Sequence, residues 1–168
     1  MTIKTNTTPT GGELDAALCS TFVRMFKPQF ALMVESGEKC QTVRPAPKRM
    51  PKKGDRISLR AWTGKPYRSK QRVLREAVIE RVETIQMNYA VIDGMTWWEV
   101  EIDGRNLDSV EVTKFAKSDG FADFSAMGEW FLVQHGLPFD GVVIYWSNAQ
   151  AQLPPQTTSA TKSSANGG

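Results

Sequence analysis

The chain has 168 residues, of which 40% are hydrophobic and 23% charged, and its formal net charge at pH 7 is +3. This length suits one compact domain. The only histidine is His135, and Cys19 and Cys40 form no Cys-x-x-Cys motif, so we expect no zinc site, no disulfide framework and no cofactor. The chain begins without an apolar signal segment and contains no run of about eighteen apolar residues, so we expect a cytoplasmic protein without a membrane span.

The composition changes near both ends of the chain. Residues 1–19 are polar, with a Thr-Thr-Pro-Thr-Gly-Gly run, and residues 148–168 consist mainly of Gln, Pro, Thr, Ser, Ala and Gly. Segments of this kind bury too little apolar surface to fold. We therefore predict a disordered N-terminal arm, a single domain over residues 20–147 and a disordered C-terminal tail.

A strand, a helix and a second strand are predicted at the start of the domain. Residues 21–26 are typical of a strand. Pro28 suits the first turn of a helix, because its missing N–H would be unpaired there in any residue. Apolar residues then follow at helical spacing, and Gly37 is expected to end the helix. Residues 41–44 are predicted as the second strand, which two nearby prolines interrupt.

Four more strands are predicted further along the chain. Residues 56–62 alternate between polar and apolar positions after a Gly-Asp turn. Residues 73–87 are rich in Val and Ile, and their apolar positions change phase, which favours a strand with a bulge or bend over the alternative of a helix. Residues 95–102 and residues 139–146 are predicted as the last two strands.

Two helices are predicted from their capping residues. Asp108 and Glu111 have the spacing of a capping box, which would begin a helix over residues 109–117. Asp123 is expected to cap a second helix that ends near Gly136. Several short strands around a few short helices predict the α+β class, in the form of a mixed β-barrel.

Positive charge is concentrated in the basic segment, residues 44–75, where twelve Lys or Arg residues accompany one acid, Asp55. From residue 76 onward there are thirteen acids and five bases. A local excess of this kind attracts polyanions, and interleaved aromatic rings can stack on bases. The alternative is a solvated loop that keeps the protein soluble. The predicted nucleic-acid or ligand-binding residues are Arg44, Lys48, Arg49, Lys52, Lys53, Arg56, Arg60, Trp62 and Tyr67.

A second candidate site lies just before the basic segment. Thr42 and Arg44 point to the same side of the predicted strand, and Lys39 lies where the chain leaves the helix. A lysine, a hydroxyl and a guanidinium at one place can bind an anion. A lysine that loses its proton in a dry pocket can also activate the hydroxyl. The alternative is ordinary surface charge beside a threonine that favours a strand.

These residues belong to a pattern that resembles the opening of ASCH domains. The resemblance covers about residues 22–146, and the chain looks most like ASCH-domain proteins of phages and prophages. Its elements are Phe-Lys-Pro-Gln-Phe at 26–30, Gly-x-Lys-x-x-Thr-x-Arg at 37–44, Gly-Asp-Arg-Ile at 54–57, Asp-Gly-Phe at 119–121 and His-Gly-Leu-Pro-Phe at 135–139.

The resemblance implies a PUA-like barrel with a cleft beside the first helix, and a protein that binds RNA. One bacterial branch of the family removes the acetyl group from acetylated cytidine with a lysine, a threonine and an acid. By position these catalytic residues are Lys39, Thr42 and Asp119, although the related enzyme has a glutamate in the third position. Aspartate is shorter by one methylene, and a displacement of about 1 Å costs up to a hundredfold in rate. The alternative for Asp119 is a structural turn at the end of a helix, with Gly120 left-handed.

Three functions follow as expectations. The first is an ASCH-domain protein that binds RNA or a nucleotide-like ligand in a cleft next to the basic loop. The second is a small amidohydrolase that acts on acetylated cytidine-type nucleosides. The third is a phage accessory protein that binds a host protein.

Overall fold

A computed structural model describes residues 20–147 of the chain as an α+β fold with three helices, which confirms the predicted class. The predicted arm at 1–19, the predicted tail at 148–168 and Cys19 lie outside the described residues. The elements are β1 (Thr21–Phe26), α1 (Pro28–Ser36), β2 (Gln41–Pro45), β3 (Arg56–Trp62), β4 (Gln71–Ile92), β5 (Met95–Ile102), β6 (Arg105–Asn106), α2 (Ser109–Ser118), α3 (Phe124–His135) and β7 (Phe139–Trp146).

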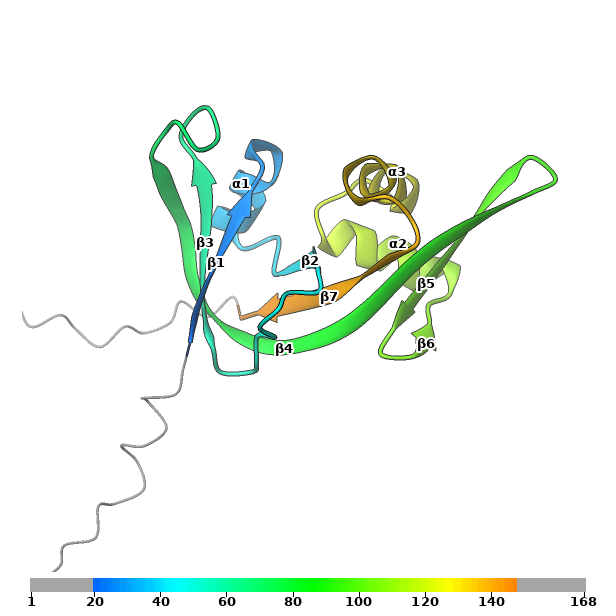
Figure 1. Cartoon of the computed structure of the whole chain (residues 1–168), viewed down its shortest axis with the longest axis horizontal. Coiled ribbons are helices and arrows are strands. Elements are labelled where there is room, and N and C mark those ends of the chain that lie inside the picture. Colours follow the sequence, from blue (N-terminus) through cyan, green and yellow to red (C-terminus); the bar gives the residue numbers. More distant parts are fainter. Residues whose placement is uncertain (1–19, 148–168) are drawn as a thin grey trace, which may run out of the picture.

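The long strand β4 organises the sheet, and Figure 1 shows it as a curved ribbon under the three helices. Its first part pairs antiparallel with β3, its middle with β7 and its last part with β5. β1 lies parallel to β3, and β2 lies antiparallel to β7. The pairing with β7 shifts register between Ile79 and Arg81, which confirms the bulge predicted from the change of apolar phase.

The sheet is not closed into the predicted mixed β-barrel. Within residues 20–147, β1 and β6 lie at opposite ends of the strand order β1-β3-β4-β5-β6 and do not pair, and β2 pairs with β7 alone. β4 is 22 residues long, and its two ends pair with different neighbours. The ends of the sheet therefore diverge along β4 instead of meeting (Figure 1).

The helix ends are where the capping residues predicted them. Pro28 occupies the first turn of α1, and Gly37 ends the helix with a left-handed φ of 82°. The Asp108 carboxylate accepts backbone N–H bonds at the start of α2, and the Glu111 carboxylate accepts the N–H of Asp108. Asp123 caps α3 through its carboxylate. These boundaries depend on local hydrogen bonds, so local sequence was sufficient to predict them.

The hairpin of β4 and β5 was predicted only in part. β4 continues five residues beyond the predicted end at Met87, and the chain turns at Asp93 and Gly94, whose φ angles are 53° and 74°. An Asp-Gly pair with two positive φ angles is typical of a two-residue hairpin turn. This turn was therefore readable from the sequence. The short strand β6 was not predicted.

Two hydrophobic clusters lie on either side of β7. Successive side chains of a strand point to opposite faces. Ile144 and Trp146 accordingly pack with β1, α1 and β3, whereas Phe139 and Val143 pack with α2, α3 and β5. Phe121, in the loop between α2 and α3, packs against both clusters. The candidate site lies where the two clusters meet.

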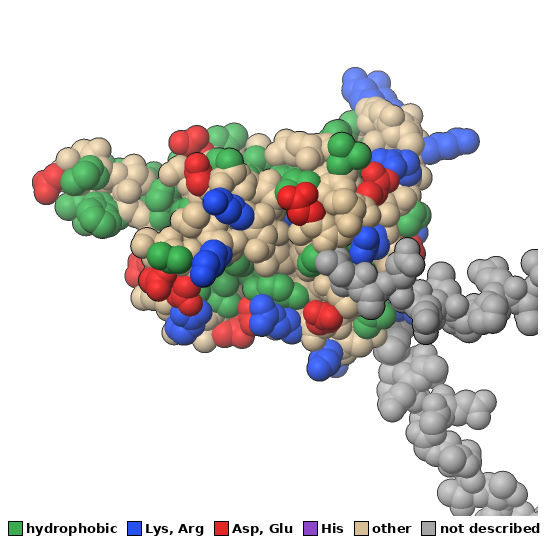
Figure 2. All heavy atoms as spheres, turned by 180° about the vertical axis from the view of Figure 1, so that it is seen from behind, with side chains coloured by type: hydrophobic (Ala, Val, Ile, Leu, Met, Phe, Trp, Pro, Cys, Tyr) green, Lys and Arg blue, Asp and Glu red, His purple; other side chains and the backbone are tan. Residues whose placement is uncertain are grey.

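The outer surface has an uneven distribution of side chains. Figure 2 shows apolar side chains at the tip of the β4–β5 hairpin and basic ones at the opposite end of the molecule. The hairpin exposes Val91, Ile92, Met95 and Trp97. Among residues 20–147, no helix is long and apolar enough to cross a membrane.

Candidate functional site

A cavity of about 200 Å³ opens between α1, β1, β2 and α3. Both hydrophobic clusters contribute to its wall, so the cavity is bounded by packed aromatic rings. Four polar residues that the sequence analysis singled out also line it, which are Lys39, Thr42, Arg44 and Asp119. The predicted convergence of these residues is therefore present in the structure.

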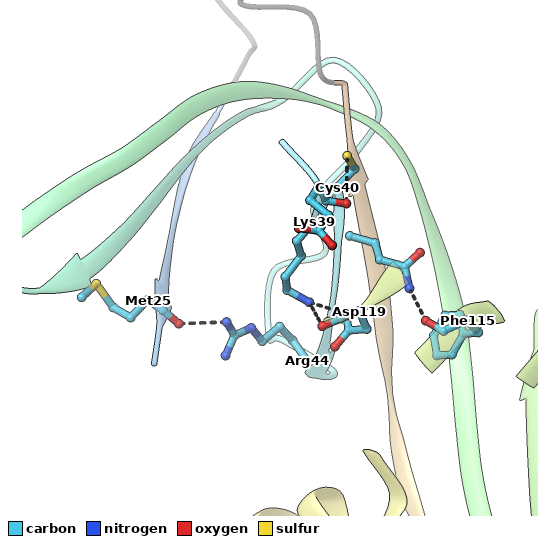
Figure 3. A network of polar contacts seen from close by, with 8 residues as sticks. Met25, Lys39, Cys40, Arg44, Phe115 and Asp119 are labelled. Carbon is cyan, nitrogen blue, oxygen red and sulfur yellow. Dashed lines mark hydrogen bonds and ion pairs between the residues drawn. The ribbon is translucent and has the colours of Figure 1, made fainter. Parts of the chain in front are cut away.

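Lys39 and Asp119 form a buried ion pair in this cavity (Figure 3). The Lys39 Nζ lies 2.9 Å from the Asp119 Oδ1, and the two side chains are only 1% and 7% exposed. The Lys39 ammonium also donates a hydrogen bond to the backbone carbonyl of Asp119. Aspartate thus reaches the lysine directly, although it is shorter than the glutamate implied by the family resemblance.

Local structure places the two partners of this pair. Lys39 follows the left-handed Gly37, and its backbone N–H bonds to the carbonyl of Met33 at 2.9 Å, which holds it close to the end of α1. Asp119 is the C-terminal cap of α2. Gly120, with a φ of 91°, then turns the chain toward α3. The helix-end interpretation of Asp119 is therefore correct and compatible with its place in the site.

Burial shifts both partners toward their neutral forms. Burial lowers the pKa of Lys39, although the Asp119 carboxylate opposes this shift. Burial raises the pKa of Asp119, against the opposing effects of Lys39, Arg44 and the backbone N–H of Val43. The proton affinities of the two groups therefore move closer together. Such perturbed pairs are typical of functional sites, and they also occur in purely structural ion pairs.

Arg44 connects β2 to β1 across the cavity wall. Its Nη2 donates a hydrogen bond of 2.8 Å to the carbonyl of Met25, and its Cζ lies 5.1 Å from the centre of the Phe26 ring. Its Nε is buried and has no hydrogen-bond partner in the described part of the chain. Burial lowers the pKa of Arg44, Asp119 opposes this shift, and the nearby Arg24 adds to it.

Thr42 lies one strand position before Val43 in β2, opposite Ile144 of β7. It is buried and lines the cavity together with Arg44, and the two-residue period of β2 puts these two side chains on one face of the strand. The hydrogen bonds of the Lys39 ammonium go to Asp119, not to the Thr42 hydroxyl. Proton transfer between Lys39 and Thr42 would therefore require this ion pair to loosen.

The basic segment contributes little to the cavity wall. Of its nine predicted ligand-binding residues, only Arg44 lines the cavity. The loop between β2 and β3 carries Lys48, Arg49, Lys52 and Lys53, all of them exposed. Most of these side chains are therefore surrounded by solvent, as the alternative of a solvated basic loop predicts.

The remaining predicted residues lie on β3 and the hairpin that follows it. Arg56 and Arg60 occupy alternate positions to the buried Ile57 and Leu59, so they lie on the opposite face of β3. Arg60 Nε donates to the Ser58 hydroxyl at 2.8 Å. The rings of Trp62 and Tyr67 contact each other, with their centres 5.3 Å apart, and Tyr67 is 90% exposed. This aromatic pair is separate from the cavity.

Several cavity residues were not assigned to the site from the sequence. Trp130, Gln134 and His135 line it from α3, and Lys27 lines it from the start of α1. The Lys27 Nζ lies 2.8 Å from the Gln134 Oε1 and 5.0 Å from the centre of the Trp130 ring. Trp130 and Gln134 are four residues apart, so helical spacing places them on one face of α3. This four-residue spacing is the feature of the sequence from which their shared face could have been predicted.

Comparisons with known proteins do not identify the chain. No family model matches it, and neither a curated protein nor a solved structure is significantly similar to it. Within residues 20–147, no three His, Cys, Asp or Glu side chains are grouped so that they could hold a metal ion. The function is therefore inferred from the residues of the cavity.

Proposed function

We propose that this chain is an ASCH-type protein of the PUA-like group that binds RNA or a nucleotide-like ligand in the cavity between α1 and α3. One observation carries the proposal: a cavity of about 200 Å³ combines aromatic rings with buried polar and cationic groups. Aromatic faces stack on nucleobases, and polar side chains bond to base edges. Lys39, Thr42, Arg44 and Asp119, which belong to the motifs of the ASCH resemblance, all line this cavity.

The charges of the cavity favour an anionic ligand or one rich in acceptors. Lys27, Lys39 and Arg44 line the cavity, and Asp119 is the one acid among the described residues of its wall. The rings of Phe30, Phe121 and Trp130 share this wall with the cationic groups and provide apolar surface for a planar base. A planar, polar and negatively charged molecule fits such a lining best.

Binding of nucleosides, nucleotides and a short RNA strand tests this proposal, with Trp130→Ala as the variant and Trp62→Ala as the matched control. Loss of a stacked base costs about 1–3 kcal/mol, so we expect Trp130→Ala to weaken binding about tenfold or more. Trp62→Ala should leave the affinity unchanged, because Trp62 lies outside the cavity. Absence of binding by the unmodified protein, or a loss confined to Trp62→Ala, would refute the proposal.

A second candidate function is the hydrolysis of acetylated cytidine-type nucleosides. The buried Lys39–Asp119 pair favours it, because it lies in the same cavity as the Thr42 hydroxyl. In this hypothesis neutral Lys39 accepts the Thr42 proton, and the Thr42 oxygen attacks the acetyl carbon. The amine of the nucleoside leaves with a proton from Lys39, and water then releases acetate from the threonine ester. Asp119 would orient Lys39.

Release of cytidine from acetylcytidine tests the second function. We expect turnover by the unmodified protein, no turnover by Lys39→Ala, and no change in Lys52→Ala, which removes an exposed lysine outside the cavity. If the unmodified protein releases no cytidine at high concentration, the cavity is a binding site only.

A further inference from the structure

Two arginines lie close to each other at the β1 side of the cavity. Arg44 lines the cavity, whereas Arg24 lies outside its lining, next in sequence to the lining residue Met25. Phe22, Arg24 and Phe26 alternate along β1 and so share one face of the strand. The Cζ of Arg24 lies 5.4 Å from the centre of the Phe22 ring, and the Cζ of Arg44 lies 5.1 Å from the centre of the Phe26 ring. Arg44 also donates a hydrogen bond to the carbonyl of Met25, the residue next to Arg24.

Neither guanidinium has an acidic partner of its own. Within residues 20–147, none of the ion pairs includes Arg24 or Arg44. Their hydrogen bonds go to the backbone carbonyls of Val23 and Met25. Asp119, the acid that acts on Arg44, is already paired with Lys39.

Each of the two arginines also has an unsatisfied donor. Arg24 Nε and Arg44 Nε are buried and have no hydrogen-bond partner among residues 20–147. Buried donors in native proteins are nearly always bonded, so two such groups on neighbouring side chains require an explanation. Two like charges close together are costly when the nearby acid, Asp119, is already paired with Lys39, and an anion bound beside them would reduce that cost.

A phosphate group fits this arrangement. Guanidinium groups bind phosphate through parallel N–H bonds, and Arg is the usual residue for such recognition. Arg49 lies nearby, with its Cζ 5.4 Å from the centre of the same Phe22 ring, and it extends the positive surface toward the β2–β3 loop. Asp55 acts electrostatically on Arg49, whereas Arg24 and Arg44 form no ion pair within residues 20–147.

We propose that Arg44, in the cavity wall, and Arg24, just outside the cavity beside Met25, form a phosphate subsite next to β1, so that the ligand is a phosphorylated nucleoside and not a free one. The identity of the ligand as a nucleoside rests on the proposed function, whereas the anion site itself does not. The phosphate belongs either to a mononucleotide or to an RNA strand, and both present the same group to the two arginines.

The test compares dissociation constants for the four nucleosides, the four nucleoside 5′-monophosphates and a short mixed-sequence RNA. The protein is used as the full chain, unmodified and with Arg24→Gln. Arg56→Gln is the matched control, because it removes one exposed arginine from the other face of β3. Thermal unfolding of each protein with and without inorganic phosphate or pyrophosphate completes the set.

We expect the unmodified protein to bind a phosphorylated ligand at least tenfold more tightly than the matching nucleoside, as charge-assisted hydrogen bonds allow. Arg24→Gln should remove most of this advantage and leave nucleoside affinity unchanged, and Arg56→Gln should retain the advantage. Preference for monophosphates over RNA would identify a mononucleotide ligand, and the reverse would identify a strand; either result supports the subsite.

Equal affinity for nucleosides and their monophosphates would overturn the proposal, as would an unchanged ratio in Arg24→Gln. If the protein binds no nucleoside, monophosphate or RNA, the proposed function fails. Thermal unfolding with and without phosphate or pyrophosphate then tests the phosphate subsite separately. A phosphate-dependent rise in unfolding temperature that Arg24→Gln abolishes then supports it, and no such rise overturns it.

Discussion

The cavity and the basic segment both carry positive charge, but their surroundings differ. Lys52 and Lys53 are exposed in the β2–β3 loop, where water and salt screen their charges. Lys39 is almost fully buried beside Asp119, and Arg44 lies in the same wall. Interactions between charges strengthen as the effective dielectric falls. Under the proposed function, we therefore expect the dense basic segment to attract polyanions and the buried charges of the cavity to hold one ligand.

The largest expected effect concerns the buried ion pair. Asp119→Ala would leave the Lys39 ammonium buried without its partner, so we expect the free energy of unfolding to fall by about 3–5 kcal/mol. The matched control is the double variant Lys39→Met and Asp119→Leu, which removes both charges and should stay near the stability of the unmodified protein. Urea denaturation measures both.

A decrease of less than about 1 kcal/mol in Asp119→Ala would mean that Lys39 gives up its proton at little cost or reaches water in that variant. The buried charge of Lys39 would then behave like an exposed one.

Charge reversal in the exposed loop should have a smaller and different effect. With Lys52→Glu and Lys53→Glu, we expect mononucleotide affinity to remain unchanged at physiological salt, because neither side chain lines the cavity. RNA affinity should fall, and the slope of log K against log salt should decrease by about 1 for each phosphate group that the variant no longer neutralises. Titrations at several salt concentrations measure this slope.

The same titrations also test whether the loop and the cavity are separate sites. If reversal of the two lysines weakens mononucleotide binding as strongly as Arg44→Gln does, the loop and the cavity act as one site.

The smallest expected effect is a pH dependence at the cavity rim. Burial, Arg44 and Lys27 lower the pKa of His135 below its ordinary value. A histidine with a lowered pKa stabilises the fold above its ordinary pKa, and that stability is lost as the pH falls through the lowered value. We therefore expect His135→Gln to reduce the drop in unfolding temperature between about pH 7.5 and about pH 5.

Thermal unfolding across this pH range is the measurement, and Gln134→Ala is a neighbouring cavity variant without a titratable group. Parallel curves for His135→Gln and the unmodified protein would show that His135 does not contribute.

Much of the candidate site was predictable because its parts are local. Thr42 and Arg44 share a face through the two-residue period of β2, and Lys39 follows a glycine that ends α1. Asp119 was assigned by position in the ASCH resemblance. Trp130 and His135 were not assigned to the cavity, since nothing near them in sequence indicates that α3 and β1 face each other across it.

Sequence alone determined the helix caps, most strand positions and the bulge in β4, because these depend on hydrogen bonds and side-chain alternation within a few residues. The tertiary structure decided that the sheet stays open and that Arg56 and Arg60 lie on the far side of β3. It also decided that Lys39 meets Asp119 across 80 residues of chain. Packing of two hydrophobic clusters on the two faces of β7 brings these distant segments together, and no local pattern encodes that contact.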